Sequence, residues 1–146
     1  MEYRHILCSV DGSELSEMGL KHAAYLSKTT GAKLSIIHVV EKWYRAADVV
    51  TTSPEWQKIH EDWLNKGREV LEAAARKARD GGGAHIQTVL KEGDAAYEIV
   101  AMATEHRMDV IVMATHRYSS VGKLFAGSVT DKVSRKAPCP VLWVFK

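Results

Sequence analysis

Residues 33–40 read KLSIIHVV, a run in which apolar and β-branched side chains occupy both alternating sets of positions. A strand with one face in solvent alternates apolar and polar side chains, whereas a strand buried on both faces, as in a parallel sheet, is apolar on both. Residues 5–10, HILCSV, have the same character. We therefore predict two buried strands of a parallel sheet in this part of the sequence.

Helical and strand patterns alternate along the whole sequence. Residues 13–28 place apolar side chains on one helical face, and Ser13 and Gly31 are residue types that begin and end helices. Further helices are predicted over 56–78, 94–106 and 128–136, and further strands over 85–91, 109–114 and 141–145. This order predicts an α/β fold, a doubly wound (Rossmann-like) five-stranded parallel sheet with helices on both faces.

The predicted helix over 56–78 carries apolar residues at steps of three and four, the pattern of a helix packed against a sheet. Its apolar stripe comprises Trp56, Ile59, Trp63, Val70, Leu71, Ala74 and Ala78. Asp80 and three following glycines end the helix, because glycine is a poor helix former.

Composition limits the class of protein. The 146 residues, 46% of them apolar and 26% charged, predict one globular domain over 1–146. Twenty Lys and Arg against eighteen Asp and Glu leave a net charge of +2, too balanced to favour nucleic acid or an anionic membrane as partner. Cys8 and Cys139 form no disulfide framework, and no signal peptide is visible, so we expect a cytoplasmic protein.

A ligand site is expected at the carboxyl ends of the strands, where doubly wound sheets bind their ligands. The loop 114–128 leads there into the last helix, and Gly127-Ser128 offers free backbone N–H groups at the positive end of the helix dipole. The same residues also fit a plain helix cap, and the charge of Asp131 opposes a phosphate at this position. Both interpretations stay open.

Catalytic and metal-binding motifs are missing from the sequence. The seven histidines have no metal-ligand spacing, although His116 lies in the candidate loop and His38 in a predicted buried strand. No serine has the setting of a hydrolase nucleophile, and the loop has no evident general base. We therefore expect a binding protein rather than an enzyme.

The sequence resembles the universal stress protein family from end to end. The resemblance rests on ILCSVDGS, KLSIIHVV, GDAAYEIVAMATEHRMDVIVM and AGSVTDKVSRKAPCPVLWVFK. Many members bind ATP through G-x-x-G, nine residues and G-[ST]. Here Ala114 and Arg117 replace the first two glycines, while Gly127 and Ser128 are kept. Arg117 either crowds the phosphates or binds them through its guanidinium.

The resemblance implies a site for ATP or AMP, with Mg²⁺ as a companion of the phosphates. Asp11 corresponds to the family's acidic residue near ribose and metal, and Val39 to the position beside adenine. The implied site comprises Ser9, Val10, Asp11, Val39, Met113, Ala114, His116, Arg117, Gly127, Ser128, Val129 and Thr130. The implied function is that of a stress-response sensor or effector, with weak ATP hydrolysis as the last-ranked alternative.

The last predicted strand, VLWVF at 141–145, is apolar on both faces and lies at a sheet edge in the expected strand order. An exposed apolar edge favours pairing with a second copy, and family members dimerise through this strand. The sequence thus predicts a homodimer. It leaves one alternative function, a dimeric interaction module whose nucleotide pocket has lapsed.

Overall fold

A computed structural model describes residues 1–42, 51–116 and 128–146. Along this part of the chain the elements are β1 (His5–Ser9), α1 (Glu14–Thr30), β2 (Lys33–Glu41), α2 (Pro54–Asp80), β3 (Ile86–Gly93), α3 (Ala95–Glu105), β4 (Val110–Thr115), α4 (Val129–Lys136) and β5 (Val141–Phe145). The strands form one five-stranded sheet in the order β3-β2-β1-β4-β5. Every pairing is parallel.

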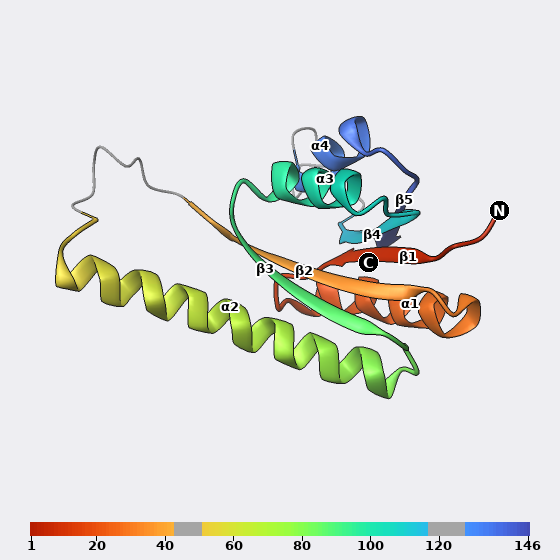
Figure 1. Ribbon diagram of the computed structural model, residues 1–146, viewed down its shortest axis with the longest axis horizontal. Coiled ribbons are helices and arrows are strands. Elements are labelled where there is room, and N and C mark those ends of the chain that lie inside the picture. The colour runs from red at the N-terminus through yellow and green to blue at the C-terminus, as the bar shows by residue number, and fades with distance from the viewer. Residues whose placement is uncertain (43–50, 117–127) are drawn as a thin grey trace.

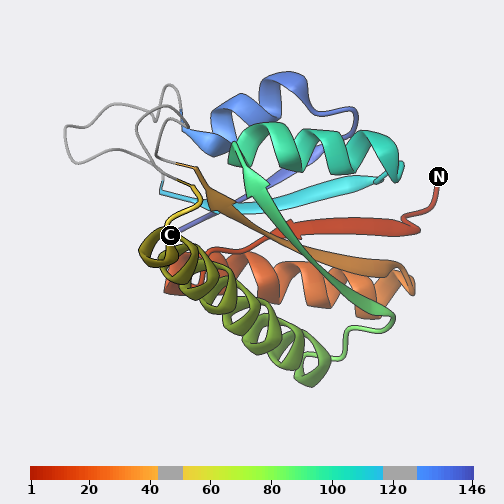
Figure 2. The same ribbon diagram turned by 60° about the vertical axis from the view of Figure 1, so that its left-hand side comes forward.

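Helices cover both faces of the sheet, α1 and α2 on one and α3 and α4 on the other (Figures 1 and 2). Each interface has its own apolar core. Ile6, Leu34 and Val112 face α1 and α2, and Leu7, Ile37 and Ile111 face α3 and α4. The predicted α/β doubly wound fold is therefore confirmed, because these strands bury both of their faces.

The helix ends follow the predicted capping residues. The Ser13 hydroxyl accepts the Ser16 N–H at 3.1 Å, and Gly31 ends α1 in the left-handed conformation, with φ 75°. Asp94 and Ser128 cap α3 and α4 in the same way. The second helix is longer than predicted, since Ser53 caps it and Pro54 occupies its first turn.

The predicted apolar stripe of α2 packs on the sheet over only half its length. Leu71, Ala74 and Ala78 are buried, whereas the Ile59 side chain is 46% exposed and Trp56 is half-buried. The start of α2 extends past the carboxyl ends of β2 and β3 (Figure 1), and His60, in its second turn, reaches Glu92 near the end of β3 at 2.6 Å. The prediction of packing was wrong for this first part of the helix.

Hydrogen bonds tie together distant segments at two places in the described chain. The Ser27 side chain is fully buried, and its hydroxyl lies 2.7 Å from the Ala32 carbonyl and 3.3 Å from that of Ala84. At the start of β1 the backbone N–H groups of Arg4 and His5 both donate to Asp109 Oδ2 at 2.8 Å. These contacts join segments that are far apart in the sequence.

Neither cysteine of the described chain is in a disulfide. Burial raises the pKa of the Cys8 thiol to about 12, and Cys139 is half-buried. Among the described helices, none has a stretch long and apolar enough to cross a membrane.

Candidate functional site

A cavity of about 350 Å³ lies at the carboxyl ends of β1 and β4, where the strand order reverses. Eight of the residues predicted from sequence line it: Ser9, Val10, Asp11, Val39, Met113, Ala114, Val129 and Thr130. Ser128 stands at its border as the cap of α4. The structure thus brings together residues from four separate segments of the chain.

The remaining predicted residues lie elsewhere or outside the description. His116 is exposed directly after β4 and is not among the described residues that line the cavity. Arg117 and Gly127 fall in 117–127, outside the described residues. Sequence reasoning missed Ser16, His38, Glu41 and Ala95, which also line the cavity. Of these, Ser16 and Ala95 follow predicted helix caps, a signal that pointed to this edge of the sheet.

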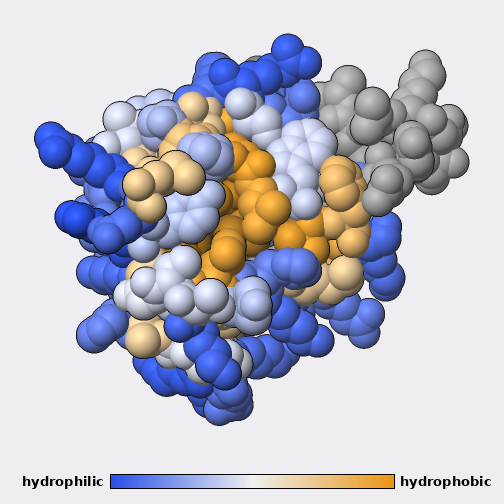
Figure 3. Space-filling model, turned by 90° about the vertical axis from the view of Figure 1, so that its right-hand side faces the viewer, coloured by the Kyte–Doolittle hydropathy of each residue, from blue (hydrophilic) through white to orange (hydrophobic). Residues whose placement is uncertain are grey.

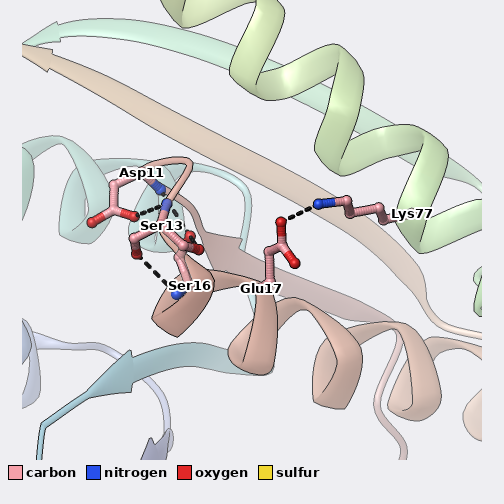
Figure 4. A network of polar contacts seen from close by, with 5 residues as sticks. All are labelled: Asp11, Ser13, Ser16, Glu17 and Lys77. Carbon is pink, nitrogen blue, oxygen red and sulfur yellow. Dashed lines mark hydrogen bonds and ion pairs between the residues drawn. The ribbon is translucent and has the colours of Figure 1, made fainter.

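The turn between β1 and α1 is held by a network of hydrogen bonds (Figure 4). Asp11 Oδ1 accepts the Ser13 N–H at 2.8 Å. The Ser16 hydroxyl accepts the Asp11 N–H at 3.3 Å and donates to the Ser13 carbonyl at 3.0 Å. Gly12 adopts φ 84°, a left-handed conformation that favours glycine. The Asp11 carboxylate is thereby fixed at the mouth of the cavity.

The pKa of Asp11 lies below its usual value. Burial opposes ionisation, but hydrogen bonds from Ser13 and Ser16 and the charge of His38 outweigh it. Asp11 is therefore a carboxylate at neutral pH, as a group that accepts ribose hydroxyls or binds a cation must be. Asp11 thus both holds the turn and lines the cavity.

His38 supports the end of β1 from the neighbouring strand. Its Nδ1 lies 2.8 Å from the Val10 carbonyl, and because a carbonyl only accepts, Nδ1 carries the hydrogen. On its other side the ring lies against α2 at Gly67, where an added Cβ would be 3.2 Å from Cδ2. The predicted strand is confirmed, but the His38 side chain is half-buried and lines the cavity, where its ring has a satisfied hydrogen bond.

Ala114, at the first altered glycine of the motif, has room in the structure. Among the described non-glycine residues only His85 and Arg107 have a positive φ, so the conformation of Ala114 is one that alanine adopts freely. Gly19 of α1 faces it, and a Cβ at Gly19 would lie 3.3 Å from the Ala114 Cβ. The missing side chain at Gly19 leaves space for the methyl group at Ala114.

The first turn of α4 lies at the cavity, which Val129 and Thr130 help to line. The Ser128 hydroxyl accepts the Asp131 N–H at 3.1 Å, which leaves the N–H groups of Val129 and Thr130 without an intrahelical acceptor. Asp131 forms an ion pair with Arg135 at 3.1 Å. This pairing offsets part of the negative charge that would oppose an anion at this helix end.

The described residues contain no group of three or more His, Cys, Asp or Glu side chains that could hold a metal ion. Asp11 is the described aspartate that lines the cavity. Together with Glu41 it gives the cavity two carboxylates, and one or two carboxylates suit Mg²⁺ that is bound mainly through phosphate oxygens.

The chain belongs to the universal stress protein family, whose sequence profile matches residues 2–144. The universal stress protein YxiE of Bacillus subtilis (strain 168) is 34% identical over 151 residues, with 97% of this chain and 99% of YxiE covered. The universal stress protein MJ0531 of Methanocaldococcus jannaschii is 34% identical over 146 residues, with 99% of this chain and 83% of MJ0531 covered.

Solved universal stress proteins share the fold. UspA from Lactobacillus plantarum superimposes with a TM-score of 0.83 at 20% identity over 99% of both chains. A universal stress protein in complex with cAMP superimposes with a TM-score of 0.76 at 24% identity, over 99% of this chain and 98% of that one. The AMP-bound universal stress protein family protein from Arabidopsis thaliana superimposes with a TM-score of 0.69 at 20% identity, over 98% of this chain and 92% of that one.

Proposed function

We propose that this protein binds an adenine nucleotide, ATP or AMP, in the cavity at the carboxyl ends of β1 and β4, and acts as a cytoplasmic sensor or effector in the stress response. The observation that carries the proposal is the convergence of Asp11, Val39, Ala114 and Thr130 on one cavity beside the first turn of α4. Structural neighbours bound to cAMP and AMP support it.

Each part of the cavity suits one part of the ligand. Val39 offers an apolar surface and strand backbone to the base, and Asp11 offers carboxylate oxygens to ribose hydroxyls. Val129 and Thr130 offer N–H groups to phosphate. Mg²⁺, when bound, would neutralise phosphate charge next to Asp11. Arg117 and Gly127 are proposed to complete the phosphate subsite.

The proposed role is binding without turnover, by one domain that spans the chain. The groups placed around the cavity position and neutralise a nucleotide, which is sufficient for a sensor. The free thiols of Cys8 and Cys139 support a location in a reducing compartment.

Nucleotide released on denaturation and calorimetric titration together test the proposal. Purified protein should release adenine nucleotide when denatured, and ATP or AMP should bind with a measurable heat. Asp11→Asn should raise the Kd for the Mg²⁺ nucleotide about tenfold to hundredfold, the loss expected for a charged hydrogen-bonding group. Asp109→Asn, the same change at the opposite ends of the strands, should leave that Kd unchanged.

The outcomes separate the two candidate functions. Absence of released nucleotide, with no heat at about millimolar ATP, would favour the interaction module with a lapsed pocket. In that case Arg117→Gly, which restores the family residue, should recover binding. Equal effects of the Asp11 and Asp109 variants would place the ligand elsewhere.

We also propose that two copies pair through β5, which forms one edge of the sheet. Leu142 on this strand is 39% exposed, and Val141, Trp143 and Phe145 are half-buried. The face seen in Figure 3, on the side where β5 lies in Figure 1, carries a patch of apolar residues. An unpaired apolar edge of this kind favours association with a matching edge.

Light scattering at micromolar concentration tests the pairing. Leu142→Lys should shift a dimer toward the monomer, because a charge in a paired apolar edge is costly. Val144 is only 6% exposed and belongs to the core beneath the sheet, so a charge there would unfold the protein instead. Tyr25→Lys, at an exposed helical site, is the control. A wild-type monomer would refute the pairing.

A further inference from the structure

The edge strand β5 and helix α4 are joined by a hydrogen bond between side chains. Trp143 is on β5, and its indole Nε1–H donates to the hydroxyl of Ser134 on α4 at 2.7 Å. A second ring on the same strand, that of Phe145, contacts Trp143 edge-on with centroids 5.9 Å apart. The indole is thus held between the edge of the sheet and the helix.

The same hydroxyl continues the connection into the first turn of α4. Ser134 Oγ donates to the Thr130 carbonyl at 2.8 Å, so that it accepts from one element and donates within the other. Thr130 is only 5% exposed and lines the cavity. Two successive hydrogen bonds therefore connect the sheet edge to a residue of the proposed phosphate subsite.

We propose that Trp143 and Ser134 are positioning residues that couple the phosphate-binding turn of α4 to the edge strand β5, so that nucleotide phosphate and a second copy paired along β5 strengthen each other's binding. This inference rests on the proposed function. It adds a route by which binding at the cavity reaches the surface of the sheet.

The two hydrogen bonds restrict how α4 can move against the sheet. A back-bond from a serine hydroxyl to the carbonyl four residues earlier is common in helices and alone fixes nothing outside the helix. Here the hydroxyl also accepts from an indole on another element, so that the back-bond to Thr130 in the first turn is tied to β5. Phosphate binding requires such a fixed placement of the N–H groups.

A second copy strengthens this restriction. The Trp143–Ser134 bond lies where water reaches it, and an exposed hydrogen bond adds little because water replaces it. Pairing along β5 would exclude water from the indole, after which the loss of the bond would leave a buried donor unsatisfied. Linkage then requires that phosphate bound at α4 tightens the pairing by the same factor.

Binding of AMP and of adenosine to a small set of variants tests the proposal, with dimer dissociation measured by sedimentation. Trp143→Phe keeps a ring and removes the N–H, and Ser134→Ala removes the hydroxyl. Each should raise the Kd for AMP about threefold to tenfold and leave the Kd for adenosine unchanged, because adenosine lacks the group that α4 binds. The double variant should equal either single variant, since both break one connection.

Matched controls separate positioning from stability. Ser134→Thr keeps the hydroxyl and should retain wild-type affinity for AMP. Thr104→Ala removes the same kind of back-bond from α3, where the hydroxyl donates to Val100 at 2.8 Å, and should change neither ligand. AMP should lower the dimer dissociation constant of wild type, and this effect should be absent in Trp143→Phe.

The outcomes are distinguishable. If wild type binds AMP and both Trp143→Phe and Ser134→Ala bind it as tightly as wild type, the coupling is overturned. The proposed function is then left intact. The coupling is also overturned if these variants bind AMP and adenosine equally more weakly than wild type. It is overturned as well if AMP does not lower the dimer dissociation constant of wild type. Wild type that binds no adenine nucleotide overturns the proposed function together with this inference.

Discussion

Gly67 lies where α2 crosses β2 and β3, and it offers a quantitative test of how closely helix and sheet approach. A Cβ built there would be 2.8 Å from Leu90 Cδ1 and 3.2 Å from both His38 Cδ2 and Val40 Cγ2. Alanine is a better helix former than glycine by about 1 kcal/mol. Overpacking a close contact costs about 1–3 kcal/mol, and the centre of that range exceeds the gain in helix propensity.

Gly67→Ala should therefore lower the free energy of unfolding by about 1 kcal/mol, about 2 kcal/mol of crowding less the gain in helix propensity. Because the new methyl group contacts the His38 ring, which supports Val10 in the cavity, we also expect weaker nucleotide binding. Urea unfolding measures the first effect and calorimetry the second.

The exposed neighbouring position Lys66 supplies the control. The difference in the free energy of unfolding between Lys66→Ala and Lys66→Gly measures the gain in helix propensity in the same helical turn without crowding. If Gly67→Ala proved more stable than wild type by that difference, α2 would not be in close contact with the strands. The account of His38 as a support of the cavity would then fail too.

Three further predictions concern groups with unusual surroundings. Ser27→Ala should cost about 1–3 kcal/mol in urea unfolding, because it leaves buried carbonyl groups without a donor. Burial opposes ionisation of Asp109, but two backbone N–H groups lower its pKa below the usual value. Its stabilisation is therefore complete above the pKa of the unfolded chain and is lost as pH falls through the lower folded pKa, and acid unfolding of Asp109→Asn measures it. Iodoacetamide should leave Cys8 unmodified in the folded protein and react first with Cys139, as mass spectrometry would show.

Local signals in the sequence predicted most of the fold. Helix caps act on the residues directly after them, so Ser13, Asp94 and Ser128 mark the helix starts where the structure has them. Strand burial follows equally from composition within a short run. The packing of the first turns of α2 was predicted wrongly, because periodicity describes the helix and contains no information on where the sheet beneath it ends.

The site was predictable in part, because its residues come from strand ends and helix starts. The contacts by which the site residues fit against their neighbours were not predictable. Ala114 fits because Gly19 faces it, and His38 fits because Gly67 does, and in each pair the two residues are distant in the sequence. Nothing in the pattern around Ser134 or Trp143 relates one to the other, since their side chains meet only when β5 and α4 pack.

The central position of β1 has a consequence for synthesis on the ribosome. One neighbour, β2, follows it closely, whereas the other is anchored by Asp109, whose contact with His5 spans 104 residues. At roughly 5–20 residues per second, that anchor emerges about 5–20 seconds after β1. During this interval a nascent three-stranded sheet has one apolar edge open at its first strand. The growing chain is therefore most prone to wrong pairing before β4 is made, and slowing translation ahead of residue 110 should increase aggregation.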